Sequence, residues 1–320
     1  VYPQYFPKQN TELEAYQQIE KDLLDAVLYA PDNTPGNKTL FSKSVARTLL
    51  AKIYAEKPLR DYTKVIQYCD EVKADGFDLV DDFSDLFGMN AAGTDAKMRN
   101  TKESILEAQF TSGAGNWCTW MFGRDLVNWN NNFTWAKWVT PSRDLISAFK
   151  QEGDEVRFKE SIVYYDCNWS NYYPSDNYPF MYKCRSANSS IIKYRYADVL
   201  LLKAEALIMQ DTPDLEGAAD IIDEVRDRAK LGALPTSVRS NKNAMLNALL
   251  KERRLELAFE GQRWFDLVRL DKVEEVMNAV YAKDSGRKAQ IYTFDKNSYR
   301  LPIPQSVIDA NDKIHQNPGY

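Results

Sequence analysis

The chain has 320 residues, of which 44% are hydrophobic and 27% charged. This composition is typical of a globular protein and excludes a disordered chain. The 41 basic and 46 acidic residues are well mixed and give a net charge of −5, so no basic block indicates nucleic-acid binding. No apolar run approaches the ~20 residues that span a membrane, and a single histidine, His315, excludes the usual His-rich zinc sites.

Three amphipathic helices are predicted in residues 1–76. Thr11 and Glu14 form a capping box at the start of the first helix. The second helix covers residues 42–56, and the third covers 61–74 and ends near Gly76, a residue that favours helix C-caps. A helix–turn–helix unit of this length is typical of a tetratricopeptide (TPR) repeat. Because only ten residues precede the first helix, we expect the chain to lack the N-terminal part of a longer protein.

Residues 77–192 are predicted to form a loop-rich insertion. They contain short β-like runs, such as 104–111 and 161–165, and one short helix at 141–150. An insertion of this length in a compact domain is usually functional or disordered, and its high aromatic content argues against disorder. We therefore expect the insertion to carry the function.

Five of the seven tryptophans lie between Trp117 and Trp138, in a stretch without a helical period and rich in Gly, Asn, Thr and Ser. Flat aromatic faces beside uncharged hydrogen-bonding groups suit a neutral, amphipathic ligand such as a sugar, which has an apolar ring face and a rim of hydroxyls. About two of the five are expected only to fill the core, because Trp is usually largely buried. The predicted ligand-binding residues are Trp117, Trp120, Trp129, Trp135, Trp138, Arg124, Asn128, Asn130 and Asn131.

The four cysteines form no CxxC pair. Cys69 is expected to be a buried free thiol on the third helix. Cys167 and Cys184 flank a Tyr-rich stretch and could form a disulfide in an oxidising compartment, although spacing alone does not fix the pairing. Oxygen-bearing side chains in this stretch could hold calcium, but they lack the spacing of an EF-hand and fit a polar loop with turns equally well: Asp166, Asn168, Asn171, Asp176 and Asn177.

The second half of the chain is again predicted to be helical. Residues 196–209 pair with 215–229, and residues 244–259 pair with 264–281. Repeats stack because no single helix pair can bury its own apolar face, so we predict a mainly α fold of stacked, TPR-like helix pairs. Small side chains permit close contact between the helices of the first pair: Ala204, Ala206, Ala218 and Ala219.

Three segments together resemble one known family. Residues 194–206 (YRYADVLLLKAEA) look like its third repeat, and residues 252–269 (ERRLELAFEGQRWFDLVR) look like its most diagnostic segment. The ending, LPIP at 301–304 through Asn311 to QNPGY at 316–320, looks like its usual C-terminus. The chain resembles the SusD/RagB family of outer-membrane lipoproteins that capture nutrients at the cell surface, from the helix at Thr11 onward.

The resemblance implies a SusD-like fold of stacked TPR-like helix pairs with a long loop-rich insertion. It implies one domain over residues 1–320, in which 1–76 and 193–320 form the helical scaffold and 77–192 the ligand-binding insertion. The family's N-terminal part, with its lipid-anchor Cys, its first repeat helices and often part of its binding site, is expected to be missing from this domain. Association with the membrane is accordingly expected only through that absent anchor.

The same resemblance implies a protein at the cell surface, on the outer membrane, that binds without catalysis. Its expected partners are an oligosaccharide or polysaccharide and a SusC-like TonB-dependent transporter, on which such proteins act as a lid. A minority branch of the family, which is RagB-like, captures peptides instead. No cofactor and no metal are expected.

The charged run at 251–269 could be interpreted as catalytic, but we favour ion pairs that fix one helix pair against the next. Glu256 and Glu260 share a helix face, and Arg253, Arg263 and Arg269 are available to neutralise them. Arg269 also follows Asp266 at i+3. The charged run is therefore predicted to be scaffold.

Two other functions fit the sequence less well. A glycoside hydrolase needs two carboxylates roughly 5–10 Å apart across the sugar, and a repeat adaptor would bind a protein helix in its concave face. The adaptor leaves the tryptophans unexplained. The carboxylates of the insertion lie in no recognisable motif, so the protein is predicted not to be an enzyme: Asp125, Asp144, Glu152, Asp154, Asp166 and Asp176.

Overall fold

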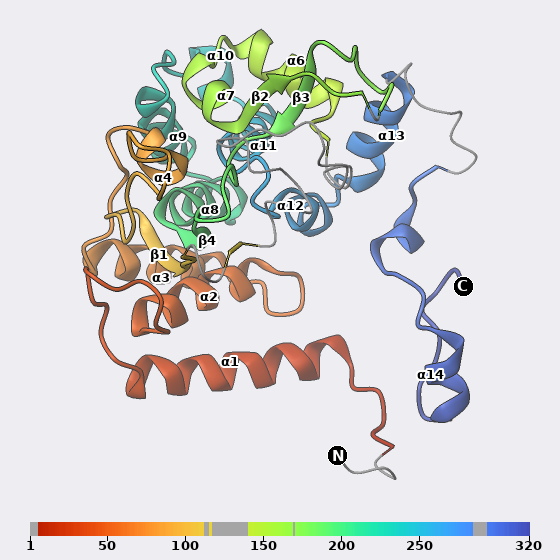
Figure 1. Ribbon diagram of the computed structural model, residues 1–320. Helices are drawn as coiled ribbons and strands as arrows, with labels where there is room; N and C mark the ends of the chain where they lie inside the picture. The colour runs from red at the N-terminus through yellow and green to blue at the C-terminus, as the bar shows by residue number, and fades with distance from the viewer. Residues whose placement is uncertain (1–5, 112–114, 117–139, 169, 284–292) are drawn as a thin grey trace.

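Helices from both ends of the chain form one continuous stack in the computed structural model (Figure 1). The structure describes residues 6–111, 115–116, 140–168, 170–283 and 293–320. Helix α3 contacts α8 directly, although more than 100 residues of chain separate them. This contact joins the N-terminal helices to the C-terminal ones and confirms the predicted mainly α fold.

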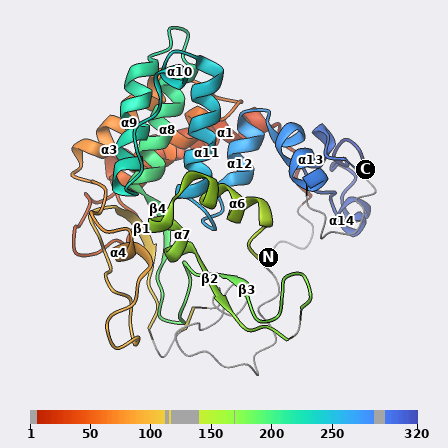
Figure 2. The ribbon, with the colours of Figure 1, turned by 90° about the horizontal axis from the view of Figure 1, so that it is seen from above.

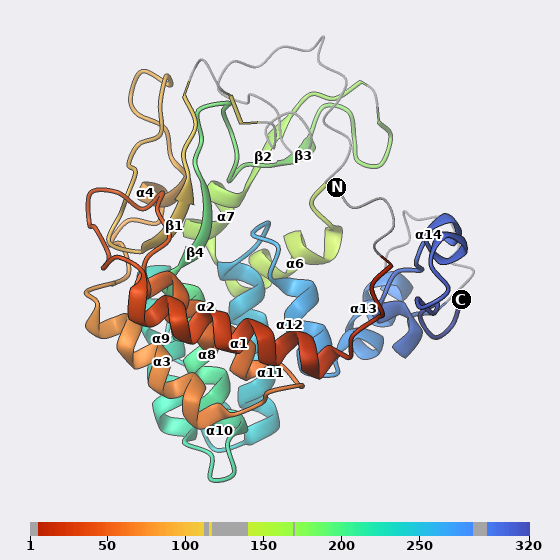
Figure 3. The same ribbon diagram turned by 90° about the horizontal axis from the view of Figure 1, so that it is seen from below.

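The N-terminal helices lie where the sequence predicts them: α1 at Glu12–Tyr29, α2 at Lys43–Ala55 and α3 at Tyr62–Ala74. The capping box at α1 is confirmed, because Thr11 Oγ1 accepts from the Glu14 backbone N–H at 3.2 Å and the Glu14 carboxylate accepts from the Thr11 backbone N–H at 2.8 Å. Asp61 caps α3, and Gly76 follows that helix with a φ of 90°, which glycine adopts without steric cost. Figure 3 shows α1 lying across α2 on the outer side of the stack.

The C-terminal half supplies helices α8 at Tyr196–Met209, α9 at Leu215–Arg228, the short α10 at Thr236–Arg239 and α11 at Lys242–Glu256. Helix α8 contacts α2, α3, α9 and α11, so it is surrounded on most sides and its side chains are buried almost all round. The four small residues expected at the α8–α9 contact are completely buried: Ala204, Ala206, Ala218 and Ala219.

The prediction of one helix over residues 264–281 is wrong. The structure has α12 at Arg263–Arg269 and α13 at Val273–Lys283. Between them Asp271 has a φ of 55°, and the Lys272 backbone N–H donates to the Leu267 carbonyl at 2.8 Å. These are the left-handed residue and the backward hydrogen bond of a Schellman motif, which ends a helix. Asp adopts this left-handed conformation more readily than most residues. The helix can therefore end here without a glycine that would mark the break in the sequence.

The middle of the chain contains more regular structure than predicted. Strand β1 at Ser104–Ala108 pairs antiparallel with β4 at Ile191–Arg195, and β2 at Ile162–Tyr165 pairs antiparallel with β3 at Tyr178–Met181. Helices α4 at Ser84–Phe87, α6 at Arg143–Glu152 and α7 at Glu155–Ser161 accompany them. The runs expected at 104–111 and 161–165 and the helix at 141–150 are thus confirmed in type, with shifted ends.

Apolar contacts fix the insertion to the scaffold. Leu145 and Phe149 of α6 and Ile162 of β2 are buried in one cluster with Leu255 and Ala258 at the end of α11. This packing places the β2–β3 hairpin at one end of the molecule, and Figure 2 shows it on the opposite side from α10.

The last residues of the chain lie against the first ones. A 3₁₀ turn at Lys296–Tyr299 and helix α14 at Gln305–Ala310 lead into a tail in which Asn311 donates to the Pro7 carbonyl at 2.9 Å. Arg300 forms an ion pair with Glu12 at 2.7 Å. The Arg300–Glu12 pair is exposed and adds little stability, but both contacts fix the path of the tail beside α1.

Candidate functional site

All nine predicted ligand-binding residues lie outside the described residues: Trp117, Trp120, Trp129, Trp135, Trp138, Arg124, Asn128, Asn130 and Asn131. The residues that bracket them are described. The side-chain amide of Asn116 donates to the Ser189 carbonyl at 3.0 Å, and the Thr140 hydroxyl lies 3.2 Å from the Tyr178 hydroxyl. Asn116 and Thr140, which bracket the tryptophan-rich segment in the sequence, therefore lie beside the β2–β3 hairpin and the residues that follow it.

Four aromatic rings follow one another along this hairpin. Tyr172 meets Tyr173 edge-on at a centroid distance of 5.0 Å, Tyr173 meets Tyr178 at 5.5 Å, and Tyr178 meets Phe180 at 5.3 Å. Tyr178 and Phe180 are buried, whereas Tyr172 and Tyr173 in the connecting loop are half-buried. The two edge-to-face contacts and the tilted one between Tyr178 and Phe180 are favourable beyond the area that they bury, so the buried pair holds the half-exposed pair in place.

Hydrogen bonds close the loop that carries Tyr172 and Tyr173. The Cys167 backbone N–H donates to the Ser175 carbonyl at 2.6 Å, and the Tyr173 hydroxyl donates to the Pro141 carbonyl at 2.7 Å. The loop is thus held both to itself and to the start of α6.

Arg143 lies between the two loop tyrosines. The central carbon of its guanidinium is 4.0 Å from the Tyr172 ring centroid and 4.7 Å from that of Tyr173, and it donates to the Tyr172 carbonyl. These are cation–π distances. Arg143 is the first residue of α6, which Ser142 caps by accepting from the Leu145 backbone N–H at 3.1 Å. The packing of α6 on α11 therefore sets the position of this guanidinium.

An open recess of about 770 Å³ lies in this loop. We call it the tyrosine recess; its lining combines two tyrosine rings with small polar side chains: Cys167, Asn168, Ser170, Asn171, Tyr172, Tyr173, Pro174 and Ser175. Aromatic faces beside amide and hydroxyl groups can hold a ligand that is apolar on one face and hydroxylated at its edge. The described surface thus has the same chemistry that the sequence predicts for the tryptophan-rich segment.

Sequence reasoning did not single out Tyr172, Tyr173 or Arg143 as ligand residues. In the sequence these tyrosines belong only to a Tyr-rich stretch between Cys167 and Cys184. The available signal was the density of aromatic residues on both sides of Pro174, which repeats the composition of the tryptophan-rich segment. Arg143 had no local signal, because its contacts with the tyrosines join positions about 30 residues apart.

The disulfide considered for Cys167 and Cys184 is not formed, because Cys167, like Cys69, is a buried free thiol. Burial raises the pKa of the Cys69 thiol above its usual value, so this thiol is unreactive. Within the described ranges, no three His, Cys, Asp or Glu side chains gather closely enough to hold a metal ion.

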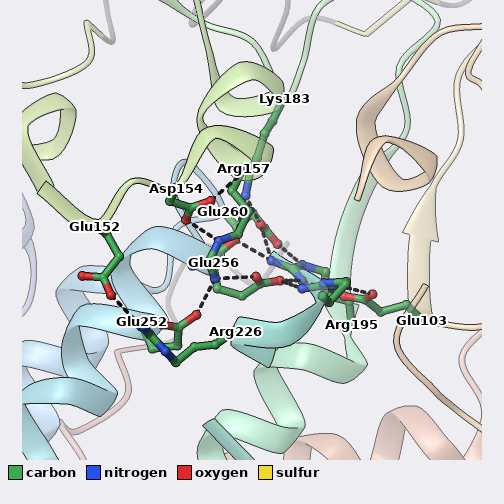
Figure 4. A network of polar contacts seen from close by, with 11 residues as sticks. Glu103, Glu152, Asp154, Arg157, Lys183, Arg195, Arg226, Glu252, Glu256 and Glu260 are labelled. Atoms are coloured by element: carbon green, nitrogen blue, oxygen red, sulfur yellow. Dashed lines mark hydrogen bonds and ion pairs between the residues drawn. The ribbon is translucent and has the colours of Figure 1, made fainter. Parts of the chain in front are cut away.

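Beneath the insertion lies a buried network of charges around Glu256 (Figure 4). Its carboxylate forms ion pairs with Arg157 of α7 at 3.0 Å, with Arg195 at the end of β4 and with Arg228 of α9. Burial alone would raise the pKa of Glu256, but the three arginines outweigh it and hold that pKa well below its usual range. One carboxylate thus connects four separate elements.

The network confirms the prediction that the charged run of residues 251–269 is scaffold, but its pairing differs from the one expected. Arg253 pairs with Asp198 at 2.7 Å and with Asp266 at 2.9 Å, not with Glu256 or Glu260. Arg269 pairs with Glu205 at 2.8 Å and, as expected, with Asp266 at 2.7 Å.

Arg263 does not neutralise either glutamate, because its guanidinium donates to the Leu250 carbonyl at 2.8 Å. Glu260 is instead paired with Arg195 at 2.7 Å and with Lys183 at 2.6 Å. The partners of both glutamates therefore come from the insertion and from the adjoining strand and helix, not from the charged run itself.

Lys183 gives this network a measurable pH dependence. Burial lowers the pKa of its ammonium from 10.5 to about 8, against the attraction of Glu260. The unfolded chain then binds more protons than the folded one between pH 8 and 10.5, so this group makes unfolding less favourable as pH rises through that window. The stabilisation that comes from the titration of Lys183 is complete above pH 10.5 and is lost as pH falls through 8.

Urea unfolding of the wild type and of Lys183→Met over pH 7–11 checks this expectation. The free energy of unfolding of the wild type should rise relative to that of the variant between pH 8 and 10.5. The neighbouring groups do not interfere, because Glu260 titrates well below this window and Arg195 above it. Parallel pH curves for the two proteins would contradict the buried-lysine account.

Three of the six carboxylates considered for hydrolysis are used in scaffold ion pairs. Asp144 pairs with Arg254 at 2.7 Å, Glu152 pairs with Arg226 at 2.7 Å, and Asp154 is buried against Arg157. Asp166 and Asp176 are exposed on the hairpin loop, and Asp125 lies outside the described residues.

None of the described helices combines the length and the apolar character that crossing a membrane requires.

Comparison with known proteins gives consistent results. The model of the SusD family matches residues 175–320. SusD-like protein P38 of Formosa agariphila is 42% identical over 99 residues, which are 29% of this chain and 19% of that protein. The match thus spans about a fifth of that relative's length.

Solved structures share the fold. A laminarin-binding SusD-like protein is 25% identical with a TM-score of 0.70, over 96% of this chain and 69% of that one. Surface glycan-binding protein A from Bacteroides thetaiotaomicron, in complex with laminarihexaose, is 19% identical with a TM-score of 0.74, over 97% of this chain and 72% of that one. The predicted SusD-like fold is confirmed, and residues 175–320 match the model of the SusD family.

Proposed function

We propose that this protein binds oligosaccharides or polysaccharides at the cell surface and delivers them to a SusC-like TonB-dependent transporter. The observation that carries the proposal is the surface formed by Tyr172, Tyr173 and Arg143 beside the two residues that bracket the tryptophan-rich segment in the sequence. The laminarin and laminarihexaose ligands of two proteins with the same fold support it.

The chemistry of binding follows from the side chains. An aromatic ring stacks on the apolar face of a sugar, and the stacked area supplies affinity. Amide and guanidinium groups then orient the sugar through its hydroxyls. In this assignment the tryptophans and the loop tyrosines supply stacking, while Asn128, Asn130, Asn131 and Arg124 are hydroxyl partners.

The organisation of the chain supports separate roles for the helical scaffold and the ligand-binding insertion. We assign the helices of residues 1–76 and 193–320 to the scaffold and residues 77–192 to ligand binding. The ion pairs around Glu256 connect the two parts, because Arg157 belongs to the insertion and Arg228 to the scaffold. Location on the outer membrane and attachment through a lipid anchor belong to the same proposal, by analogy with the family.

We also propose that binding occurs without turnover, because a capture protein must release its ligand unchanged. Asp144, Glu152 and Asp154 are already engaged by arginines, so they are poorly placed to act as a carboxylate pair across a sugar. A RagB-like peptide binder is the second candidate, and it is favoured only by Arg143, whose positive charge suits an acidic peptide.

A glycan-array screen followed by affinity titration tests the function. A glycan that binds, with laminarihexaose as the first probe, should keep its affinity within about twofold between low and high salt, because no charge pair is screened. Affinity for a charged peptide would instead fall steeply with salt. Selective peptide binding, or shortened glycan after incubation with the purified protein, would contradict the proposal.

A further inference from the structure

A second recess, of about 440 Å³, lies between β4, the residues that follow β3, and the turn after α11. We call it the β4 recess; it shares no lining residue with the tyrosine recess. Its volume lies in the range of small-molecule sites. Five of its lining side chains are large and apolar: Phe87, Met181, Ile191, Ile192 and Phe259.

Three charged side chains also line the β4 recess, and two of them are compensated within the protein. Glu260 accepts from Arg195 Nε at 2.7 Å and from Lys183 Nζ at 2.6 Å. Lys183 also donates to the Glu256 carbonyl at 2.8 Å and lies 4.6 Å from the ring centroid of Phe87. These contacts belong to the network of Figure 4, in which Lys183 points toward Glu260.

The third charge belongs to Lys193. Lys193 is exposed at the rim of the β4 recess and forms no ion pair with any of the described residues. The recess therefore combines an apolar wall with one positive charge at its mouth. A cation would be repelled there, and a sugar would place several of its hydroxyls against the five apolar side chains, where they lose their hydrogen bonds to water, which is unfavourable.

We propose that the β4 recess binds a small amphipathic carboxylate, whose apolar body packs against Phe87, Ile192 and Phe259 and whose carboxylate pairs with Lys193. The apolar contacts supply affinity by removing surface from water, and the ion pair selects the anion. A carboxylate with one aromatic ring and a short side chain matches the size of the recess. This site is independent of the proposed glycan function.

Isothermal titration with trans-cinnamate tests the charge requirement. Cinnamyl alcohol has the same ring and chain without the charge and should bind about three- to fivefold more weakly, as expected for a rim ion pair. Lys193→Met, which keeps the apolar stem, should reduce cinnamate to the affinity of the alcohol and leave the alcohol unchanged. Lys242→Met is the matched control, since exposed Lys242 begins α11 at the opposite end from Phe259.

Two further variants test the location. Ile191→Trp should fill the β4 recess and abolish binding of both probes, while Tyr172→Ala in the tyrosine recess should leave both affinities unchanged. Melting temperatures establish whether each variant is folded. If Ile191→Trp does not fold, Lys193→Met still tests the proposal, because Lys193 is exposed and its replacement should not disturb the fold. The proposal is overturned by equal affinities for acid and alcohol, by unchanged cinnamate affinity in Lys193→Met, by loss of binding in Tyr172→Ala, or by no binding of cinnamate to the wild type.

Discussion

Replacing Glu256 by glutamine is expected to lower the free energy of unfolding by about 3–5 kcal/mol, which is the usual cost of removing one charged partner from a buried ion pair. The carboxylate is fully buried and is shared by Arg157, Arg195 and Arg228. Glutamine keeps the size of the side chain but removes the charge, and its amide group presents donors to arginines that are themselves only donors. Three buried cations would then compete for the remaining acids of the network.

The matched control is Glu155→Gln. Glu155 is exposed at the start of α7, two residues before Arg157, so the same chemical change at the surface should alter stability by no more than about 0.5 kcal/mol. Urea unfolding at neutral pH measures both variants. A loss below about 1 kcal/mol for Glu256→Gln would show that the network contributes little to holding the insertion on the helices.

Replacing Tyr172 by alanine is expected to weaken glycan binding by about 1–3 kcal/mol, the usual effect of truncating an aromatic anchor. Tyr172 is half-buried, and its ring contacts both Tyr173 and Arg143. The substitution therefore removes one stacking face and also releases the guanidinium that the ring helps to position. Stability should change much less than affinity, because Tyr172 lies in a loop outside the main core.

Tyr29→Ala is the control for this substitution. Tyr29 is 83% exposed at the end of α1 and belongs to no part of the aromatic surface. Titration calorimetry with a glycan found by the array should give the wild-type dissociation constant for Tyr29→Ala and a five- to hundredfold larger one for Tyr172→Ala, by the energies above. Equal constants for the two variants would remove Tyr172 from the binding surface.

The helical scaffold could be predicted because its signals are local. The capping box at Thr11, the glycine after α3 and the 3.6-residue period of α2 and α9 each lie within one turn or one helix of the element that they define. The break at Asp271 escaped prediction because an aspartate, rather than a glycine or asparagine, takes the left-handed position.

The pairing of the buried charges could not be predicted for a different reason. Glu256 meets Arg195 across 61 residues and Arg157 across 99 residues of sequence, and nothing in the local pattern of either segment specifies the other. The tyrosine recess likewise depends on the closure of its loop through Cys167 and Ser175. Sequence composition indicated the chemistry of the site, but only the fold brings Arg143 to the tyrosines.

The most direct test of glycan binding by this aromatic surface is calorimetric titration of a variant in which alanine replaces Trp117, Trp120, Trp129, Trp135 and Trp138 together. With several stacking anchors removed, the dissociation constant for the glycan should rise by at least about a hundredfold. The melting temperature of the variant shows whether the scaffold remains folded, and the Tyr29→Ala protein serves as the binding-competent reference. Full glycan affinity in the folded five-tryptophan variant would contradict the assignment of the site.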